Sequence, residues 1–179
     1  MHHDIDNEQK ISVHWDGPIE INWKDEIDLS AFNIDGYVIY LICGTHGMYG
    51  KNVPLYIGKT EKNTVMNRIG QHLINWLKYE PDSVYIYAAA VQKFASWEDL
   101  PETYSRPDEN LISAVEEILI YAHQPAYNKI HKSILSEKSR NIRVFNSGKR
   151  TALYPEISGF MFYQSGLQSR PLLNDDSEL

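Results

Sequence analysis

The sequence has little cysteine, no long run of apolar residues and no excess of positive charge. Its single cysteine, Cys43, excludes an intrachain disulfide framework and a zinc site built from cysteines. It also indicates a reducing compartment. No signal peptide and no apolar run long enough to span a bilayer are present. We therefore expect a cytoplasmic protein without a membrane partner.

The net charge of −7 argues at first against nucleic acid, but the charges are unevenly distributed. Residues 1–35 hold nine acidic residues and two lysines, and residues 171–179 hold three acidic residues and no base. Residues 36–170 hold twelve acidic and fifteen basic residues. This weakly basic middle is compatible with nucleic-acid binding and does not demonstrate it.

The length of 179 residues and the 42% hydrophobic content indicate one folded domain with additions. We place the domain at residues 36–130. An acidic N-terminal extension, residues 1–35, precedes it. A C-terminal extension, residues 131–179, follows it and ends in a loose acidic tail.

The order of expected elements in the middle of the chain is strand, strand, helix, strand, helix. β-Branched and aromatic runs predict the strands, and apolar residues at helical spacing predict the helices. The strands are 36–43, 53–58 and 83–94, the helices are about 64–78 and 107–123, and a glycine-rich loop is expected at 44–52. This order predicts an α+β fold with a small three-stranded antiparallel sheet flanked by helices.

The flanking segments are expected to be β-rich additions. The stretch "ISVHWDGPIEINW", residues 11–23, predicts two short extended runs around an Asp-Gly turn. The stretch "NIRVFNSGKRTALY", residues 141–154, predicts a hairpin.

Charged residues lie at the margins of the apolar stripes on both expected helices. Arg68 and His72 are four residues apart and therefore lie on one side of the first helix. Glu116 lies at the margin of the second helix near His123, whereas Glu117 is expected to point to solvent. Such margins border clefts, where desolvated charges usually have a function. His123 is expected to pack rather than to bind a metal.

Two tyrosines lie on the neighbouring expected strands. Tyr40 follows "VI" in the first strand, and Tyr56 precedes "IG" in the second. A hairpin between these strands can place both hydroxyls on one face. Gly58 would leave room there for a close approach to the backbone. Taken alone, a tyrosine on a strand is usually half-buried packing.

These residues together resemble the GIY-YIG endonuclease domain in type and in order. The matching elements are "VIY" (38–40), "YIGKT" (56–60), the pair of arginine and histidine, a glutamate in "EEILIYAHQPAYN", and the final "PAYN" (125–128). The first triplet departs from the family in having valine where glycine is usual, and the connection between the triplets is long. The resemblance covers about residues 36–130.

The resemblance implies a metal-dependent phosphodiesterase. Glu116 would bind one Mg²⁺ or Mn²⁺ ion as a hard oxygen ligand. Arg68 would bind the scissile phosphate with its planar donors. Tyr40 or Tyr56 would orient or deprotonate the attacking water, and the resemblance favours Tyr40 as the base.

The remaining residues of the implied site have supporting roles. His72 would donate to a phosphate oxygen or relay a proton. Lys59 would provide positive charge beside the tyrosines. Asn128 would orient the site from behind. Each of these residues, taken alone, is equally well explained as a helix edge, a surface charge or a helix stop.

A cluster of bases near the expected C-terminal hairpin is a second candidate for nucleic-acid contact. It is either a solvated surface or a set of phosphate contacts without sequence choice. The basic residues of the cluster are Lys138, Arg140, Arg143, Lys149 and Arg150. Together with Lys59 and Arg68, we expect Arg143, Lys149 and Arg150 to contact nucleic acid.

The sequence therefore predicts an endonuclease that cuts DNA, with RNA as the alternative substrate. A cutter of both strands with one active site per chain would work as a homodimer or nick twice. The alternative function is a nucleic-acid-binding or protein-interaction module that has lost cleavage.

Overall fold

The structure is a computed structural model that describes residues 8–22, 38–60, 64–98 and 109–162. The acidic tail expected at 171–179 lies outside these residues, as do residues 1–7 and 23–37 of the N-terminal segment. The strands are β1 (Gln9–Ile21), β2 (Val38–His46), β3 (Gly50–Thr60), β4 (Val84–Lys93), β5 (Ile142–Gly148) and β6 (Glu156–Ser158). The helices are α1 (Val65–Asn75), the 3-10 turn η3 (Leu77–Tyr79), α2 (Glu109–His123) and α3 (Glu137–Arg140).

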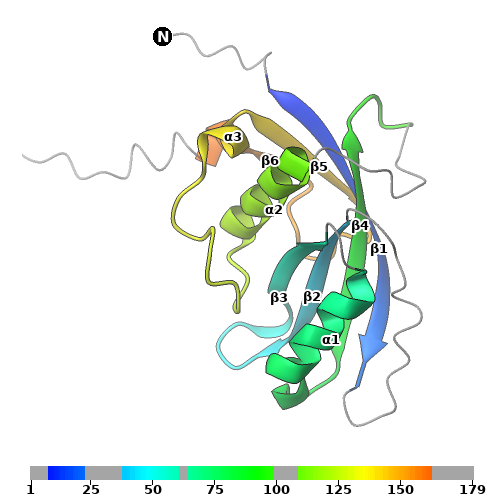
Figure 1. Ribbon diagram of the computed structural model, residues 1–179. Helices are drawn as coiled ribbons and strands as arrows, with labels where there is room; N and C mark the ends of the chain where they lie inside the picture. Colours follow the sequence, from blue (N-terminus) through cyan, green and yellow to red (C-terminus); the bar gives the residue numbers. More distant parts are fainter. Residues whose placement is uncertain (1–7, 23–37, 61–63, 99–108, 163–179) are drawn as a thin grey trace, which may run out of the picture.

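The described strands form one six-stranded mixed sheet, so the predicted fold class of a small three-stranded sheet is wrong. The strand order is β3-β2-β4-β1-β5-β6, and β1 and β5 are the parallel pair. The sheet curves strongly along its length (Figure 1). The three predicted strands are present as the antiparallel segment β3-β2-β4, and the flanking β-rich segments extend that same sheet.

β1 lies within the sheet, between β4 and β5, and not beside it. It is a single strand with a register shift between Asp16 and Ile19, where two strands around a turn were predicted. The alternation of apolar Ile11, Val13 and Trp15 places these side chains in the core. Pairing on both sides of β1 therefore overrides the local turn signal of Asp-Gly.

Two other sequence predictions need correction. The loop expected at 44–52 is largely strand, because β2 continues to His46 and β3 begins at Gly50. The hairpin expected at 141–154 is instead β5 paired with β6, whose residues 156–158 lie further along the chain.

The helices cover opposite faces of the sheet around β2. Ile39 and Leu41 belong to the core cluster that contains the apolar side of α2. Tyr40 and Ile42 belong to the cluster that contains Ile69 of α1. The predicted helices are confirmed at these positions, and the hydroxyl of Thr64 accepts a hydrogen bond from the Asn67 N–H and caps α1.

Glu117 is buried, contrary to the expectation that it points to solvent. Its carboxylate accepts hydrogen bonds from the Ser136 N–H, the Ser136 hydroxyl and the Ser139 hydroxyl. The segment before α3 folds over this side of α2, and a helical wheel of α2 alone cannot reveal that cover. None of the described helices combines the length and the apolar character needed to cross a membrane.

Candidate active site

Tyr40 and Tyr56 lie on the same face of neighbouring strands. Tyr40 pairs across β2 and β3 with Gly58, and Tyr56 pairs with Ile42. The two tyrosine rings are stacked with their centroids 6.1 Å apart. A Cβ at Gly58 would lie 2.5 Å from the Tyr40 hydroxyl and 2.8 Å from the Tyr56 ring. Glycine at this position therefore leaves the space that the two tyrosine rings occupy.

The two tyrosines differ in their access to solvent. Tyr40 has no exposed surface, whereas Tyr56 is partly exposed. Burial raises the pKa of Tyr40 well above 10, and the neighbouring Tyr56 adds to the shift. Burial also raises the pKa of Tyr56, with the negative charge of Glu116 as the next cause. Both hydroxyls therefore hold their protons at neutral pH.

His72 lies between the tyrosines and Trp76. Its Nε2 is 2.8 Å from the Tyr40 hydroxyl, and its Nδ1 accepts a hydrogen bond of 3.1 Å from the Trp76 indole N–H. The His72 ring also packs on Tyr56, with centroids 4.5 Å apart. Burial lowers the pKa of His72 to about 4, and the positive charge of Arg68 acts in the same direction. His72 is therefore neutral at pH 7.

Arg68 presents an unsatisfied donor at this site. Its Nε is buried and has no hydrogen-bond partner among the described residues. One of its terminal nitrogens donates to Gln71 at 3.0 Å. The positive charge of Arg68 acts on Tyr40, Tyr56 and His72, so the guanidinium lies near all three rings. A buried guanidinium donor without a partner is costly unless a ligand accepts from it.

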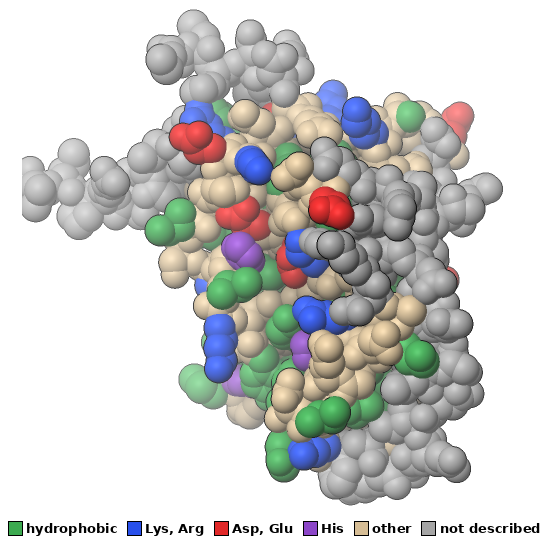
Figure 2. All heavy atoms as spheres, in the orientation of Figure 1, with side chains coloured by type: hydrophobic (Ala, Val, Ile, Leu, Met, Phe, Trp, Pro, Cys, Tyr) green, Lys and Arg blue, Asp and Glu red, His purple; other side chains and the backbone are tan. Residues whose placement is uncertain are grey.

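Glu116 and Lys59 link this site to α2. The negative charge of Glu116 raises the pKa values of Tyr40 and Tyr56, so Glu116 is the acidic residue that acts on both tyrosines. Lys59 of the edge strand β3 donates to the Ser113 hydroxyl at 2.5 Å, three residues before Glu116 on α2. Figure 2 shows side chains of both charge signs and histidines gathered where α1 and α2 approach each other.

Glu116 is the carboxylate that acts on both tyrosines, so it is the candidate ligand for a divalent ion at this edge. Among residues 8–22, 38–60, 64–98 and 109–162, no three His, Cys, Asp or Glu side chains form a metal-binding group. Glu116 would therefore be one carboxylate ligand, with water and substrate oxygens completing the shell, as Mg²⁺ accepts. Neither ring nitrogen of His72 is directed toward such an ion, because each already lies against another side chain.

Asn128 holds the edge strand at the site from behind. Its carboxamide oxygen accepts from the Ile57 N–H and its amide donates to the Ile57 carbonyl, each at 2.9 Å. The preceding residue adds a bond from the Tyr127 N–H to the Leu55 carbonyl at 2.8 Å. Asn128 is buried and is directed at backbone, so it positions β3, and with it Tyr56.

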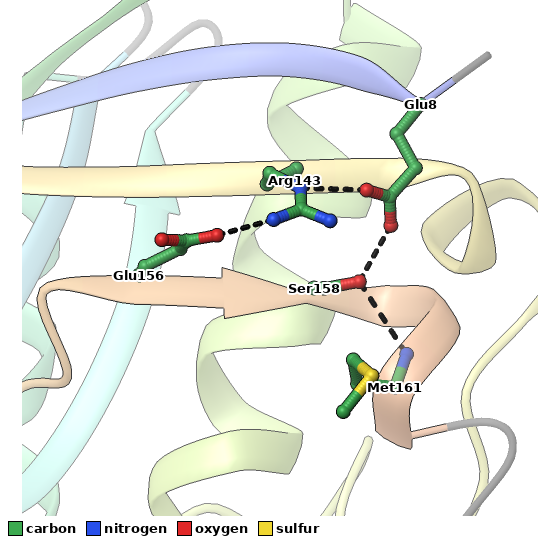
Figure 3. Close-up of polar contacts among 5 residues, drawn as sticks. All are labelled: Glu8, Arg143, Glu156, Ser158 and Met161. Carbon is green, nitrogen blue, oxygen red and sulfur yellow. Dashed lines mark hydrogen bonds and ion pairs between the residues drawn. The ribbon is translucent and has the colours of Figure 1, made fainter. Parts of the chain in front are cut away.

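The structure places Arg143, one of the predicted C-terminal bases, away from this site. Arg143 lies on β5, which three strands separate from β3. It forms ion pairs with Glu8, at 2.6 Å, and with Glu156, and Glu8 also accepts from the Ser158 hydroxyl (Figure 3). Its charge is therefore matched within the fold.

The other two bases predicted to contact nucleic acid lie in the connection between β5 and β6. Arg150 donates to the Leu153 carbonyl in its own turn, and Lys149 is exposed. Contact of these bases with nucleic acid stays a prediction.

Two further side chains near the site complete the comparison with the sequence. His123 packs as expected, since its Nδ1 donates to the Leu119 carbonyl and its Nε2 accepts from the Tyr154 N–H. Trp76, to which the sequence pattern assigned no role in the site, contacts His72 directly. Its spacing of four residues from His72 on a helix was the available signal.

Comparison with known proteins found no relatives. A scan against models of protein families gave no match, and searches of curated proteins and of solved structures gave none either.

Proposed function

We propose that this protein is an endonuclease that hydrolyses phosphodiester bonds in DNA with one Mg²⁺ or Mn²⁺ ion. The observation that carries the proposal is the buried Nε of Arg68, which has no partner among the described residues and lies near two tyrosines, a histidine and a carboxylate. A phosphate oxygen is the ligand that best satisfies an unpaired guanidinium donor. The resemblance of these residues to the GIY-YIG nucleases supports the same function.

In the proposed reaction, a water oxygen forms a bond to phosphorus while the bond to the leaving 3′ oxygen breaks. The attacking water gives up a proton to solvent and the 3′ oxygen takes one up, so the products are a 5′ phosphate and a 3′ hydroxyl. Negative charge builds on the phosphate oxygens, and fixed positive charge stabilises it. Arg68 would bind the phosphate, and Lys59 would add positive charge from the opposite side of the edge strand. A divalent ion at Glu116 would supply further positive charge to the phosphate when bound.

The partial exposure of Tyr56 makes it the better candidate for contact with the attacking water. Tyr40 is fully buried and holds its hydroxyl against His72. The proposal therefore gives Tyr56 the water-facing role and Tyr40 the supporting role, the reverse of the assignment that the resemblance favours. Because both tyrosines are protonated at neutral pH, Tyr56 orients the water in the resting enzyme.

The proposal includes a cytoplasmic location, because the single cysteine, Cys43, is a buried free thiol, as is common in a reducing compartment. It also includes DNA as the substrate, with RNA as the substrate to test next, and a homodimer for cleavage of both strands.

The test is cleavage of supercoiled plasmid by the purified chain with Mg²⁺, with Mn²⁺ and with EDTA. We expect metal-dependent nicking or linearisation that is lost in Glu116→Ala. The matched control is Glu109→Ala, which removes an exposed carboxylate from the first turn of the same helix. Arg68→Ala should lower cleavage by at least about a hundredfold, as removal of a phosphate-stabilising donor does.

Cleavage that survives in Glu116→Ala would refute the assignment of the metal ligand. A folded wild-type chain that cuts neither DNA nor RNA in any of these conditions would refute the nuclease function. Retained binding of DNA in that case would establish the alternative, a nucleic-acid-binding module without cleavage.

A further inference from the structure

The indole of Trp76 has an unambiguous role in its hydrogen bond with His72. An indole N–H is a donor only, and here it lies 3.1 Å from the Nδ1 of His72. The Nδ1 must therefore offer a lone pair and carry no proton. A neutral imidazole has one proton, so that proton is on Nε2.

The Nε2 of His72 is 2.8 Å from the Tyr40 hydroxyl oxygen. Because Nε2 carries the proton, His72 is the donor in this bond and Tyr40 the acceptor. The reverse direction would require a proton on Nδ1, facing the indole N–H of Trp76. Two donors would then point at each other across 3.1 Å.

We propose that Trp76 is a positioning residue that fixes His72 in the Nε2–H tautomer, so that His72 donates to Tyr40 and the Tyr40 proton is directed away from His72. The two hydrogen bonds then run in one direction, from Trp76 to His72 and from His72 to Tyr40. Their significance for catalysis rests on the proposed nuclease function, whereas the tautomer itself does not.

The surroundings favour a neutral His72 with this tautomer. The charged and titratable groups that face the His72–Tyr40 pair are Tyr56 from β3, Arg68 from α1 and Glu116 from α2. Arg68 disfavours a second positive charge on His72, and burial acts in the same direction on its pKa. A doubly protonated ring would also place its Nδ1 proton against the indole.

The direction of these two bonds fixes the direction of the Tyr40 hydroxyl. Because Tyr40 accepts from His72, its own proton is directed away from Nε2. The partly exposed Tyr56, whose ring stacks on that of Tyr40, lies beside it. Loss of the Trp76 donor would release His72 to adopt the other tautomer, and Tyr40 would then donate to His72.

The first experiment reads the tautomer directly by ¹⁵N NMR of the full chain labelled at histidine. The signals of His72 are assigned by their loss in His72→Gln. We expect Nε2 as the protonated and Nδ1 as the unprotonated nitrogen at pH 7. A protonated Nδ1, with either one or two protons on the ring, would overturn the proposal.

The second experiment removes the donor while keeping an aromatic ring. Trp76→Phe, and as a shape-matched probe the replacement of Trp76 by benzothienylalanine, should give a mixture of both His72 tautomers. Trp97→Phe is the control, because Trp97 is exposed and packs on Phe94 and Phe145 away from His72. An unchanged Nε2–H tautomer in the benzothienylalanine protein would refute the role of Trp76.

Cleavage kinetics provide the third readout. Loss of one neutral hydrogen bond should lower kcat about fivefold in the benzothienylalanine protein, with KM unchanged. An equal loss of kcat in Trp97→Phe would show a general structural effect and overturn the positioning role. If the wild-type chain cuts nothing, the nuclease function fails while the tautomer measurement still decides this inference.

Discussion

Replacement of Asn128 by alanine tests whether this residue acts through the backbone of β3. The side chain makes two hydrogen bonds to Ile57, one to its N–H and one to its carbonyl, both at 2.9 Å. Removal leaves two backbone groups without their partner at a buried position. Each such group costs about 1–3 kcal/mol, so we expect a loss of about 2–6 kcal/mol in the free energy of unfolding.

The measurement is urea unfolding followed by tryptophan fluorescence, with thermal unfolding in parallel. A loss of about 3 kcal/mol corresponds to a decrease in Tm of roughly 6–12 °C for a chain of this size. Asn128→Asp keeps the acceptor for the Ile57 N–H but sets a carboxylate oxygen against the Ile57 carbonyl at a buried position, so its loss at pH 7 should be at least as large as that of the alanine variant. Asn67→Ala, at an exposed helix position, is the control and should change stability by less than about 0.5 kcal/mol.

Two results would refute this reasoning. Unchanged stability of Asn128→Ala together with lost cleavage would move Asn128 from the backbone of β3 into the chemistry of the site. Unchanged stability with unchanged cleavage would show that the paired hydrogen bonds to Ile57 contribute nothing that water cannot replace.

Three more predictions follow from buried contacts. Gly58→Ala should lower the free energy of unfolding in urea by about 1–3 kcal/mol and should also lower cleavage, because the new Cβ would lie 2.5 Å from the Tyr40 hydroxyl. Full stability and full activity would show that the tyrosine rings move aside without cost. Burial alone would raise the pKa of Glu117, but hydrogen bonds from Ser136 and Ser139 outweigh it and the net pKa is lowered. The stability that Glu117 contributes is therefore present above pH 4.5 and lost as the pH falls. The difference in Tm between the wild type and Glu117→Gln should shrink from pH 7 to pH 3. A constant difference in Tm would contradict this. Burial lowers the pKa of His123 to about 4, so its contribution is present above pH 6.5 and lost as the pH falls through 4. From pH 7 to pH 5, the free energy of unfolding measured in urea should fall more for the wild type than for His123→Gln. An equal fall in the two proteins would refute the lowered pKa of His123.

The strands and helices that depend only on the pattern of neighbouring residues were predicted correctly. The β-branched and aromatic runs of β2, β3 and β4 form strands, and the helical spacing around Ile69 and Ile118 forms α1 and α2. The convergence of Arg68 and His72 with the two tyrosines also follows from the periodicity of the strands and of α1, because this periodicity fixes the face on which each side chain lies.

Features that depend on distant segments were not predictable in the same way. Nothing within residues 9–21 specifies that β1 pairs with β4 on one side and with β5 on the other. The helical pattern predicts an exposed Glu117, because the residues that bury its carboxylate are Ser136 and Ser139 and lie outside its own helix. The sequence pattern does not single out Trp76, since apolar periodicity carries no information on the hydrogen-bond donor of its ring.

The position of β1 in the sheet has a consequence for synthesis of the protein on the ribosome. β1 is made first, but its two neighbours are residues 84–93 and 142–148, and the hydrogen bond between the side chains of His14 and Ser147 joins residues 133 positions apart. Until residue 148 emerges, the apolar side chains of Ile11, Val13 and Trp15 belong to a strand with an open edge. Such nascent strands bind chaperones or aggregate, so the yield of folded protein should depend on the rate of elongation more than on the stability of the finished sheet.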